Sequence, residues 1–243
     1  CERGRSGFRL TSEGQQVYHT TLELLAELDT YQDRLQSIGA GLRGKLALGH
    51  MENYLGHPQN PIVQALATLT SEAPDIALDL RTAPLEALEH GLTSGNLQVI
   101  IGTFTREIDG LNYWDLHSEK QGLYCASDHR LALAGQDLKR DQVVNAGYAA
   151  GLFGYGEEAG LLKNRVADVH QLESMLVFLL SGRGIGFLPE HVAAPHVAAG
   201  QLQQLLPEVF TQELAVRLAV REKSLASPLV RRCMELLGIP QGL

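Results

Sequence analysis

Three side chains between residues 50 and 57 have the chemistry to hold a metal ion. His50 and Glu52 lie in the segment GHMEN, and His57 follows shortly after it. Imidazole nitrogens and carboxylate oxygens are common ligands of zinc and related metals. The sequence offers no compact second set of such residues near these three. We therefore expect no metal centre.

Motifs for catalysis or cofactor binding are weak elsewhere. The G-x-G of GRGIGF (182–187) follows a predicted helix and opens a predicted strand, which reverses the context of a dinucleotide-binding fingerprint. We interpret Gly182 and Gly184 as a tight turn after a helix, with positive φ angles. No G-x-S-x-G elbow or acid–base pair of diagnostic spacing occurs. We expect neither an enzyme nor a bound cofactor.

Composition restricts the class of protein further. The chain has 243 residues, 44% of them hydrophobic and 20% charged, with a net charge of −8. No apolar run approaches the roughly 18 to 20 residues that span a bilayer, and no signal-peptide core follows the basic start. Three widely spaced cysteines indicate neither a disulfide framework nor a zinc knuckle. We expect a cytoplasmic protein without membrane contact, whose acidic balance disfavours nucleic-acid binding by the whole chain.

Residues 12–38 carry a heptad pattern that predicts a long helix. Apolar residues recur at alternating spacings of four and three, interrupted by Thr21, and this pattern is typical of a dimerising seam. The seam comprises Val17, Leu24, Leu28, Tyr31, Leu35 and Ile38. The alternative is an amphipathic helix that packs on its own domain, because Leu22 and Leu25 widen the apolar stripe. Residues 39–44 follow as a glycine-rich hinge.

The next stretch alternates strands and helices. Strands are predicted at 45–49, 76–80 and 97–102, and helices begin near Pro61, with Asn60 as its cap, and at Pro84. This spacing predicts parallel strands with right-handed crossovers.

A similar unit recurs later in the chain. A strand at 143–147 leads to a helix near 157–164, a strand near 165–167, a helix capped by Asp168 and a strand at 184–189. The final strand (213–220) and helix (227–237) return to the first unit. Two such lobes leave a cleft between them, lined by strand ends and helix N-termini, which suits a small polar molecule.

The order of several short motifs carries a family resemblance. RGRSGFRLTSEG, the heptad helix, LRGKLALG, SEAPDIALDL, LTSGNLQVIIGT, LYCASDHRLA and LLSGRGIGFLP occur in succession along nearly the whole chain. In this order they resemble the LysR-type transcriptional regulators. The resemblance implies a two-lobed, type 2 periplasmic-binding-protein-like α/β regulatory domain preceded by a long linker helix and a winged helix-turn-helix.

Domain boundaries follow from this resemblance. Residues 1–11 would be the last strand of the wing, 12–38 the linker helix and 39–44 the hinge. Residues 45–119 and 208–243 would form the first lobe, and 120–207 the second. The missing methionine and recognition helix suggest that most of the DNA-binding domain has been removed by truncation or proteolysis.

The resemblance also implies where an effector would bind. Family members hold effectors with the loops that follow the strands. These map to His50, Met51, Glu52, Asn53, Thr82, Thr103, Tyr148, Ala150 and Phe153. Many relatives carry Ser or Thr where this chain has Glu52, and an unpaired carboxylate would repel an anionic ligand. An effector with a cationic or hydroxyl donor group is then favoured, unless Glu52 pairs with Arg81 or Arg106.

The opening arginines have a role under the same resemblance. Arg3 and Arg5 would contact DNA phosphates beside the major groove, or else would be solvated charges on a hairpin. The expected partners are a small-molecule effector, promoter DNA and further copies of the chain in a homodimer or homotetramer. A transporter's solute-binding protein and a small two-lobed lyase or dehydratase are the alternative functions, because the fold alone does not choose among them.

Overall fold

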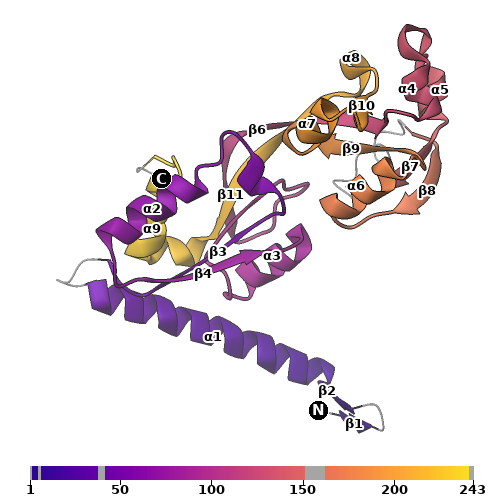
Figure 1. Ribbon diagram of the computed structural model, residues 1–243. Coiled ribbons are helices and arrows are strands. Elements are labelled where there is room, and N and C mark those ends of the chain that lie inside the picture. Colours follow the sequence, from indigo (N-terminus) through magenta and orange to yellow (C-terminus); the bar gives the residue numbers. More distant parts are fainter. Residues whose placement is uncertain (1, 5–6, 38–41, 151–161, 241–243) are drawn as a thin grey trace.

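A single sheet connects two α/β lobes. The structure is a computed structural model that describes residues 2–4, 7–37, 42–150 and 162–240; for residues 2–4, 7–9 and parts of 12–37 it describes the backbone alone. Nine strands form the main sheet, in the order β4-β3-β5-β11-β6-β9-β7-β8, with β10 paired to β6. Figure 1 shows the lobes at the two ends of the long strands β6 and β11.

The first lobe is built from parallel strands with helical crossovers, as predicted. Its elements are β3 (Lys45–His50), α2 (Ile62–Glu72), β4 (Ala77–Thr82), α3 (Leu85–Thr93) and β5 (Val99–Gly102). Strand β3 lies between β4 and β5 and is parallel to both. Because alternate side chains of a strand point to opposite faces, Leu46 and Leu48 pack on the α2 side and Ala47 packs on the α3 side.

Two antiparallel strands form the connection between the lobes. Strand β6 (Leu111–Ala126) is one continuous strand, and it pairs with β11 (Gln212–Arg221) through a bulge between Val216 and Arg217. After β11 come η3 (Glu222–Ala226) and α9 (Pro228–Leu236), whose apolar face packs in the first lobe. The last described residues therefore lie in the same lobe as β3, β4 and β5.

The second lobe has its own two apolar clusters, one on each face of its part of the sheet. Its helices are α4 (Arg130–Leu133), η2 (Gly135–Asp137), α5 (Arg140–Val144), α6 (Leu172–Leu180), α7 (Glu190–Ala198) and α8 (Pro207–Phe210). Its strands are β7 (Gly147–Ala150), β8 (Asn164–Asp168), β9 (Ile185–Pro189) and β10 (Leu202–Gln204). The lobe boundary at 207/208 stays a prediction, and Phe210 packs with this lobe.

Several local predictions for the second lobe are wrong. Val143 and Val144 end helix α5, and the strand begins only at Gly147. Asp168 is the last residue of β8 and pairs with Arg165, whereas Gln171 takes the N-cap position of α6. Gly182 has the expected positive φ of 70°, but Gly184 does not; a Cβ at Gly184 would collide with the backbone of Gly147. Most of the helix predicted at 157–164 lies outside the described residues, and Asn164 belongs to β8.

Helix α1 (Ser12–Ser37) covers most of the segment 12–38, and its role as a linker stays a prediction. Figure 1 shows it running along the first lobe and extending beyond it to a hairpin, β1 (Glu2–Gly4) and β2 (Gly7–Arg9). The hairpin corrects the prediction of a single wing strand. Several seam residues face solvent on this chain: Val17, Leu24, Leu28 and Tyr31 are 47–67% exposed. Ile38 lies outside the described residues, and the side chain of Leu35 is not described.

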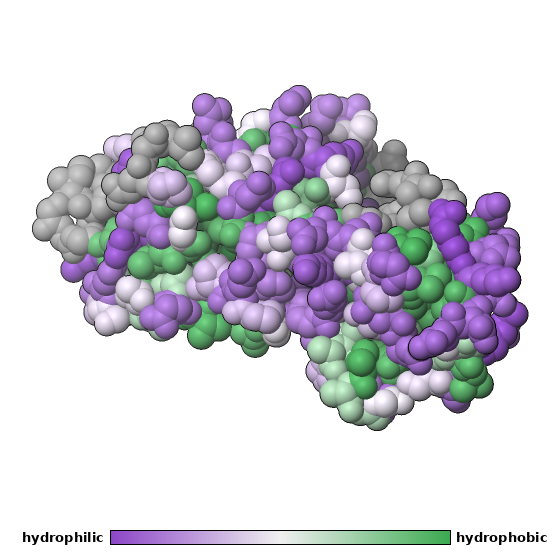
Figure 2. Space-filling view, turned by 90° about the horizontal axis from the view of Figure 1, so that it is seen from above, coloured by the Kyte–Doolittle hydropathy of each residue, from purple (hydrophilic) through white to green (hydrophobic). Residues whose placement is uncertain are grey.

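The remaining surface is mixed. Figure 2 shows one face, on which hydrophilic residues surround smaller apolar patches. Within the described ranges, every helix is too short or too polar to cross a membrane.

Candidate functional site

A small cavity lies between the lobes where the crossing strands leave the first lobe. It has a volume of about 20 Å³. Its lining residues, which we call the interlobe cavity residues, are Met51, Glu52, Tyr54, Gly102, Thr103, Glu119, Leu172, Pro189, His191 and Val216. Three of the predicted effector residues, Met51, Glu52 and Thr103, meet here. A cavity of this size holds about one water molecule, so a larger ligand would require the lobes to separate.

The ends of β3 and β5 build the first-lobe wall of the cavity. The Met51 side chain lies over Gly102, where a Cβ would come within 2.8 Å of the Met51 sulfur. The Thr103 backbone N–H donates to that sulfur at 3.1 Å. Glycine at position 102 thus allows the close approach that fixes Met51 at the cavity wall.

His50 and Thr82 lie at the ends of β3 and β4, beside this wall. His50 Nδ1 is 2.8 Å from the Met51 carbonyl oxygen, and His50 Nε2 is 3.3 Å from the Thr82 hydroxyl. Neither residue lines the interlobe cavity. Their roles in effector binding stay predictions.

Glu52 contacts the second lobe. Its carboxylate accepts a hydrogen bond from the Gln171 side-chain amide at 2.9 Å, at the N-terminus of α6. Arg81, one of the two arginines considered as its partner, instead binds Asp79 at 2.8 Å. A neutral amide leaves the charge of Glu52 in place, so the cavity mouth keeps a negative group.

Asn53 makes a second contact between the lobes. It adopts a left-handed backbone conformation with φ of 56°, which asparagine tolerates better than most residues. Its carbonyl oxygen is 3.1 Å from Nε2 of His191, on the first turn of α7. The backbone of Asn53, rather than its side chain, therefore positions a residue of the opposite lobe.

Glu119 is a buried carboxylate on β6. It is 7% exposed, and its Oε1 accepts from the Gln121 amide at 3.1 Å. Its Oε2 lies 3.7 Å from Nδ1 of His191. Burial raises the pKa of the Glu119 carboxyl group, because the charged form loses hydration.

Aromatic rings stack beside Glu119. The His57 ring lies on that of His117 with centroids 4.1 Å apart, and His191 meets His57 edge-on at 5.1 Å. The Tyr54 hydroxyl is 2.8 Å from Nε2 of His117. Burial, together with the positive charges that His117 and His191 can carry, lowers the pKa of His57 to about 4. The His57 ring is therefore held mainly in the neutral form at neutral pH.

The metal-ligand set considered from the sequence is not the one that the fold assembles. Ligand atoms of His57, Glu119 and His191 all lie within 4.8 Å of one another, whereas His50 and Glu52 are not part of this group. Sequence reasoning missed Glu119 because it lies at the predicted lobe boundary, where no local pattern marks a functional residue. It missed His191 because the pattern did not predict α7.

The second-lobe effector predictions fall elsewhere. Tyr148 and Ala150 are 4% and 2% exposed and pack in the apolar cluster that contains Leu123 and Phe187. They do not line the interlobe cavity. Phe153 lies outside the described residues. These three assignments stay predictions.

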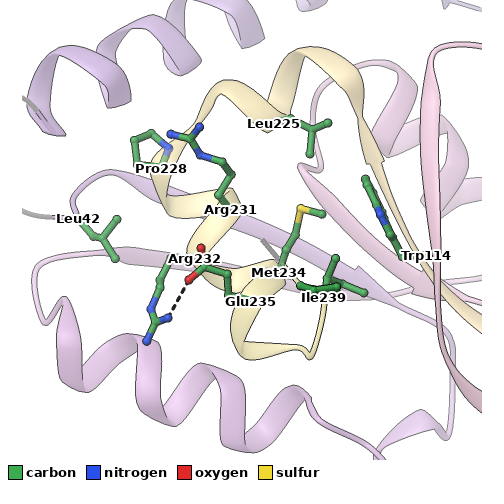
Figure 3. Close-up of a pocket in the computed structure, with 10 residues that line it drawn as sticks. Leu42, Trp114, Leu225, Pro228, Arg231, Arg232, Met234, Glu235 and Ile239 are labelled. Atoms are coloured by element: carbon green, nitrogen blue, oxygen red, sulfur yellow. Dashed lines mark hydrogen bonds and ion pairs between the residues drawn. The ribbon is translucent and has the colours of Figure 1, made fainter. Parts of the chain in front are cut away.

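A larger hollow lies on the first lobe beside α9. Its volume is about 620 Å³, and its lining is mainly apolar (Figure 3). The lining residues are Leu42, Trp114, Leu225, Pro228, Arg231, Arg232, Met234, Glu235, Ile239 and Pro240. Arg232 binds Glu235 at its rim and Glu72 of α2. Residues 38–41 and 241–243, which adjoin this lining in the chain, lie outside the described residues.

The two-lobed α/β domain with its interlobe cavity defines a ligand-binding fold, and the fold alone does not assign its function. Residues 39–238 match the LysR substrate binding domain. The chain is 33% identical over 243 residues to the HTH-type transcriptional activator BauR of Pseudomonas aeruginosa, covering 98% of this chain and 80% of that protein. The chain therefore belongs to the LysR family of transcriptional regulators, as the sequence motifs predict.

A more distant relative is also a transcriptional regulator. The HTH-type transcriptional activator TtdR of Escherichia coli is 24% identical over 247 residues, covering 97% of this chain and 77% of that protein.

Solved structures confirm the predicted fold class. ArgP from Mycobacterium tuberculosis matches with a TM-score of 0.67 at 17% identity, over 91% of this chain and 78% of that chain. A full-length OxyR variant from Pseudomonas aeruginosa matches with a TM-score of 0.65 at 17% identity, over 99% and 80%. The effector binding domain of QuiR, solved with shikimate, matches with a TM-score of 0.64 at 14% identity, over 80% and 95%.

Proposed function

We propose that this LysR-type regulator senses a small molecule carrying a cationic or hydroxyl donor group, which enters between the lobes and contacts Met51, Glu52 and Thr103. The supporting observation is the charge of the interlobe cavity. Two carboxylates, Glu52 and Glu119, line it, and none of its described lining residues is an arginine or a lysine. A carboxylate ligand would meet repulsion there, whereas an ammonium or hydroxyl group would find acceptors.

Binding would act through the separation of the lobes. The cavity of about 20 Å³ is far smaller than the roughly 300 Å³ or more of ordinary ligand pockets. The described conformation is therefore the closed one, and an effector larger than water would select a more open arrangement. It can shift this equilibrium only by its difference in affinity for the two arrangements.

The test is a binding survey of the purified chain by calorimetry. Small primary amines, amino alcohols and carboxylates of matched size are titrated in parallel. We expect saturable binding among the amines or amino alcohols, reduced at least about tenfold in Glu52→Gln, because a charge-assisted hydrogen bond contributes roughly 1.5 to 3 kcal/mol.

The matched control is Glu86→Gln, which removes one exposed carboxylate of α3 outside the interlobe cavity. It should leave the affinity unchanged. Tight binding of a carboxylate that Glu52→Gln does not alter would contradict the proposal.

The linker and hairpin would carry the signal to promoter DNA. We infer that the seam of α1 pairs two copies, that Arg3 and Arg5 contact phosphates, and that the protein acts in the cytoplasm as a sensor rather than a catalyst. In the full-length regulator, Arg3→Ala with Arg5→Ala should lower the slope of log affinity against log salt by about one to two. An unchanged slope in filter-binding assays would contradict the phosphate contacts.

A further inference from the structure

The side chains of His57, Glu119 and His191 come from three separate parts of the fold. His57 follows η1 (Tyr54–Gly56) in the first lobe, Glu119 lies on the crossing strand β6, and His191 is on α7 of the second lobe. Their ligand atoms lie within 4.8 Å of one another. A tetrahedral zinc ion with bonds of about 2.0 to 2.2 Å would hold such atoms roughly 3.4 Å apart. Small side-chain rotations would close that difference.

The hydrogen bonds of His191 leave the required nitrogen available. Its Nε2 lies 3.1 Å from the Asn53 carbonyl oxygen, which can only accept, so Nε2 carries a proton. In the neutral ring Nδ1 then has a free lone pair, and this lone pair faces Oε2 of Glu119 at 3.7 Å. Two acceptors that face each other in a site about 90% buried require a cation or a proton between them.

Glu119 is oriented in the same way. The Gln121 amide donates to its Oε1, which leaves Oε2 toward the histidines. Gln121 itself is fully buried, so this orientation is held inside the protein. A ligand whose other polar atom is fixed by a backbone carbonyl or a side-chain amide is the usual outer-shell arrangement of a metal site.

His57 is partly exposed, whereas Glu119 is buried. Its Nδ1 accepts a 3.2 Å hydrogen bond from the Gln59 backbone N–H, which metal binding through either nitrogen would replace or give up. The parallel ring of His117 keeps His57 in plane, while both nitrogens of His117 have partners of their own in Tyr54 and Ser118. His57 can therefore act as the third ligand without a further rearrangement of His117.

We propose that His57, Glu119 and His191 bind one divalent transition-metal ion of the zinc class, with a fourth position open toward the interlobe cavity. Two imidazoles and one carboxylate are a common three-ligand set for zinc with an open position. The cavity of about 20 Å³ has room for an ion or a water molecule, though not for a large ligand. Since the ligands come from both lobes and the crossing strand, the ion would hold the lobes together.

The experiment uses the purified chain after treatment with a chelator. Zn²⁺ is titrated by calorimetry, and Co²⁺ is added separately to read the visible absorption of a tetrahedral site. We expect one tight equivalent per chain and a higher melting temperature with Zn²⁺, because a ligand that binds only the folded state stabilises it. His191→Gln and His57→Gln should each weaken binding by more than the roughly 10- to 100-fold that loss of an outer-shell partner costs.

The matched control is His196→Gln on the same helix, which should bind Zn²⁺ as the parent chain does. His57→Gln changes a half-buried residue and keeps the test valid if His191→Gln fails to fold. Absence of a tight Zn²⁺ equivalent in the folded parent, or equal affinity in His57→Gln and the parent, would overturn the proposal. The amine survey is carried out in the presence of a chelator, because a bound cation would offset the charges of Glu52 and Glu119. It therefore tests the effector proposal separately from the zinc titration.

Discussion

The surface of α1 and the interlobe cavity depart from the usual distribution of residues in opposite directions. On α1 apolar side chains face water, with Val17 67% exposed and Leu24 56% exposed. Between the lobes polar side chains lie inside, with Glu119 7% exposed and Thr103 8% exposed. Each arrangement costs free energy in an isolated chain. Both costs are offset if something else binds: an apolar partner on the helix and a polar ligand or ion in the cavity.

The two regions also differ in how they are held. The interlobe cavity residues are fixed by partners on both lobes, such as Gln171 for Glu52 and Asn53 for His191. The seam residues of α1 project from a helix that reaches beyond the first lobe in Figure 1. A site held from both lobes suits a response to a small ligand or ion, whereas an exposed apolar stripe suits pairing with a like surface.

The largest effect is expected on the helix. Leu24→Glu with Leu28→Glu places two charges at the centre of the seam, where each leucine would otherwise contribute about 1.5 to 3 kcal/mol on burial. We expect the mass measured by light scattering to fall by about half at low micromolar concentration, as one oligomeric interface is lost. Removing residues 12–38 should have the same consequence.

Gln15→Glu with Gln16→Glu is the control, because it adds the same charge at exposed positions off the seam. This control should keep the parental mass. If both double variants have the parental mass, the seam of α1 does not pair with a second copy of the chain.

The next effect is expected at the cavity wall. A Cβ at residue 102 would come within 2.8 Å of the Met51 sulfur, so Gly102→Ala should force Met51 away and lose the contact from the Thr103 N–H. Overpacking of this kind costs about 1 to 3 kcal/mol in the free energy of unfolding, measured with urea. At Gly56, an added Cβ would meet His191 at an ordinary 3.5 Å. Gly56→Ala should therefore leave the free energy of unfolding almost unchanged. A similar loss of stability in both variants would mean that close packing of Met51 on Gly102 is not the cause.

The sequence predicts the frame of this region better than its site. Apolar runs that alternate with helix starts at Pro61 and Pro84 are sufficient to predict β3, β4 and β5. The strands and helices of such a unit each have a recognisable local pattern of apolar residues. Met51, Glu52 and Thr103 follow as residues at strand ends. Glu119 and His191 could not be placed in the same way, because their meeting depends on how β6 crosses between the lobes and on a helix, α7, that contains Pro195. Such tertiary contacts have no local pattern.

A smaller effect is expected from the contact that joins the lobes. Gln171→Ala removes the hydrogen bond to Glu52, which contributes about 1 kcal/mol or less at an exposed site. We expect faster hydrogen exchange at residues 50–54 with unchanged protection in α9. Gln203→Ala, at an exposed position of β10, is the control. Equal acceleration in α9 would indicate global destabilisation instead of local opening.

The smallest effect is expected on the pH dependence of stability, when a buried carboxylate outside the interlobe cavity is replaced. Glu89 of α3 is 8% exposed and does not line the interlobe cavity, and burial raises the pKa of its carboxyl group. Between the unfolded pKa and this raised value, the folded chain binds more protons than the unfolded chain, so Glu89 makes stability fall as pH rises. Glu89→Gln removes that contribution. The melting temperature of Glu89→Gln relative to that of the parent should therefore increase as the pH rises through the raised pKa of Glu89. Metal and effector binding should be unchanged. If Glu89→Gln weakened the binding of Zn²⁺ or of the effector, a buried carboxylate outside the interlobe cavity would also affect binding. The effects of Glu52 and Glu119 would then not be specific to the cavity.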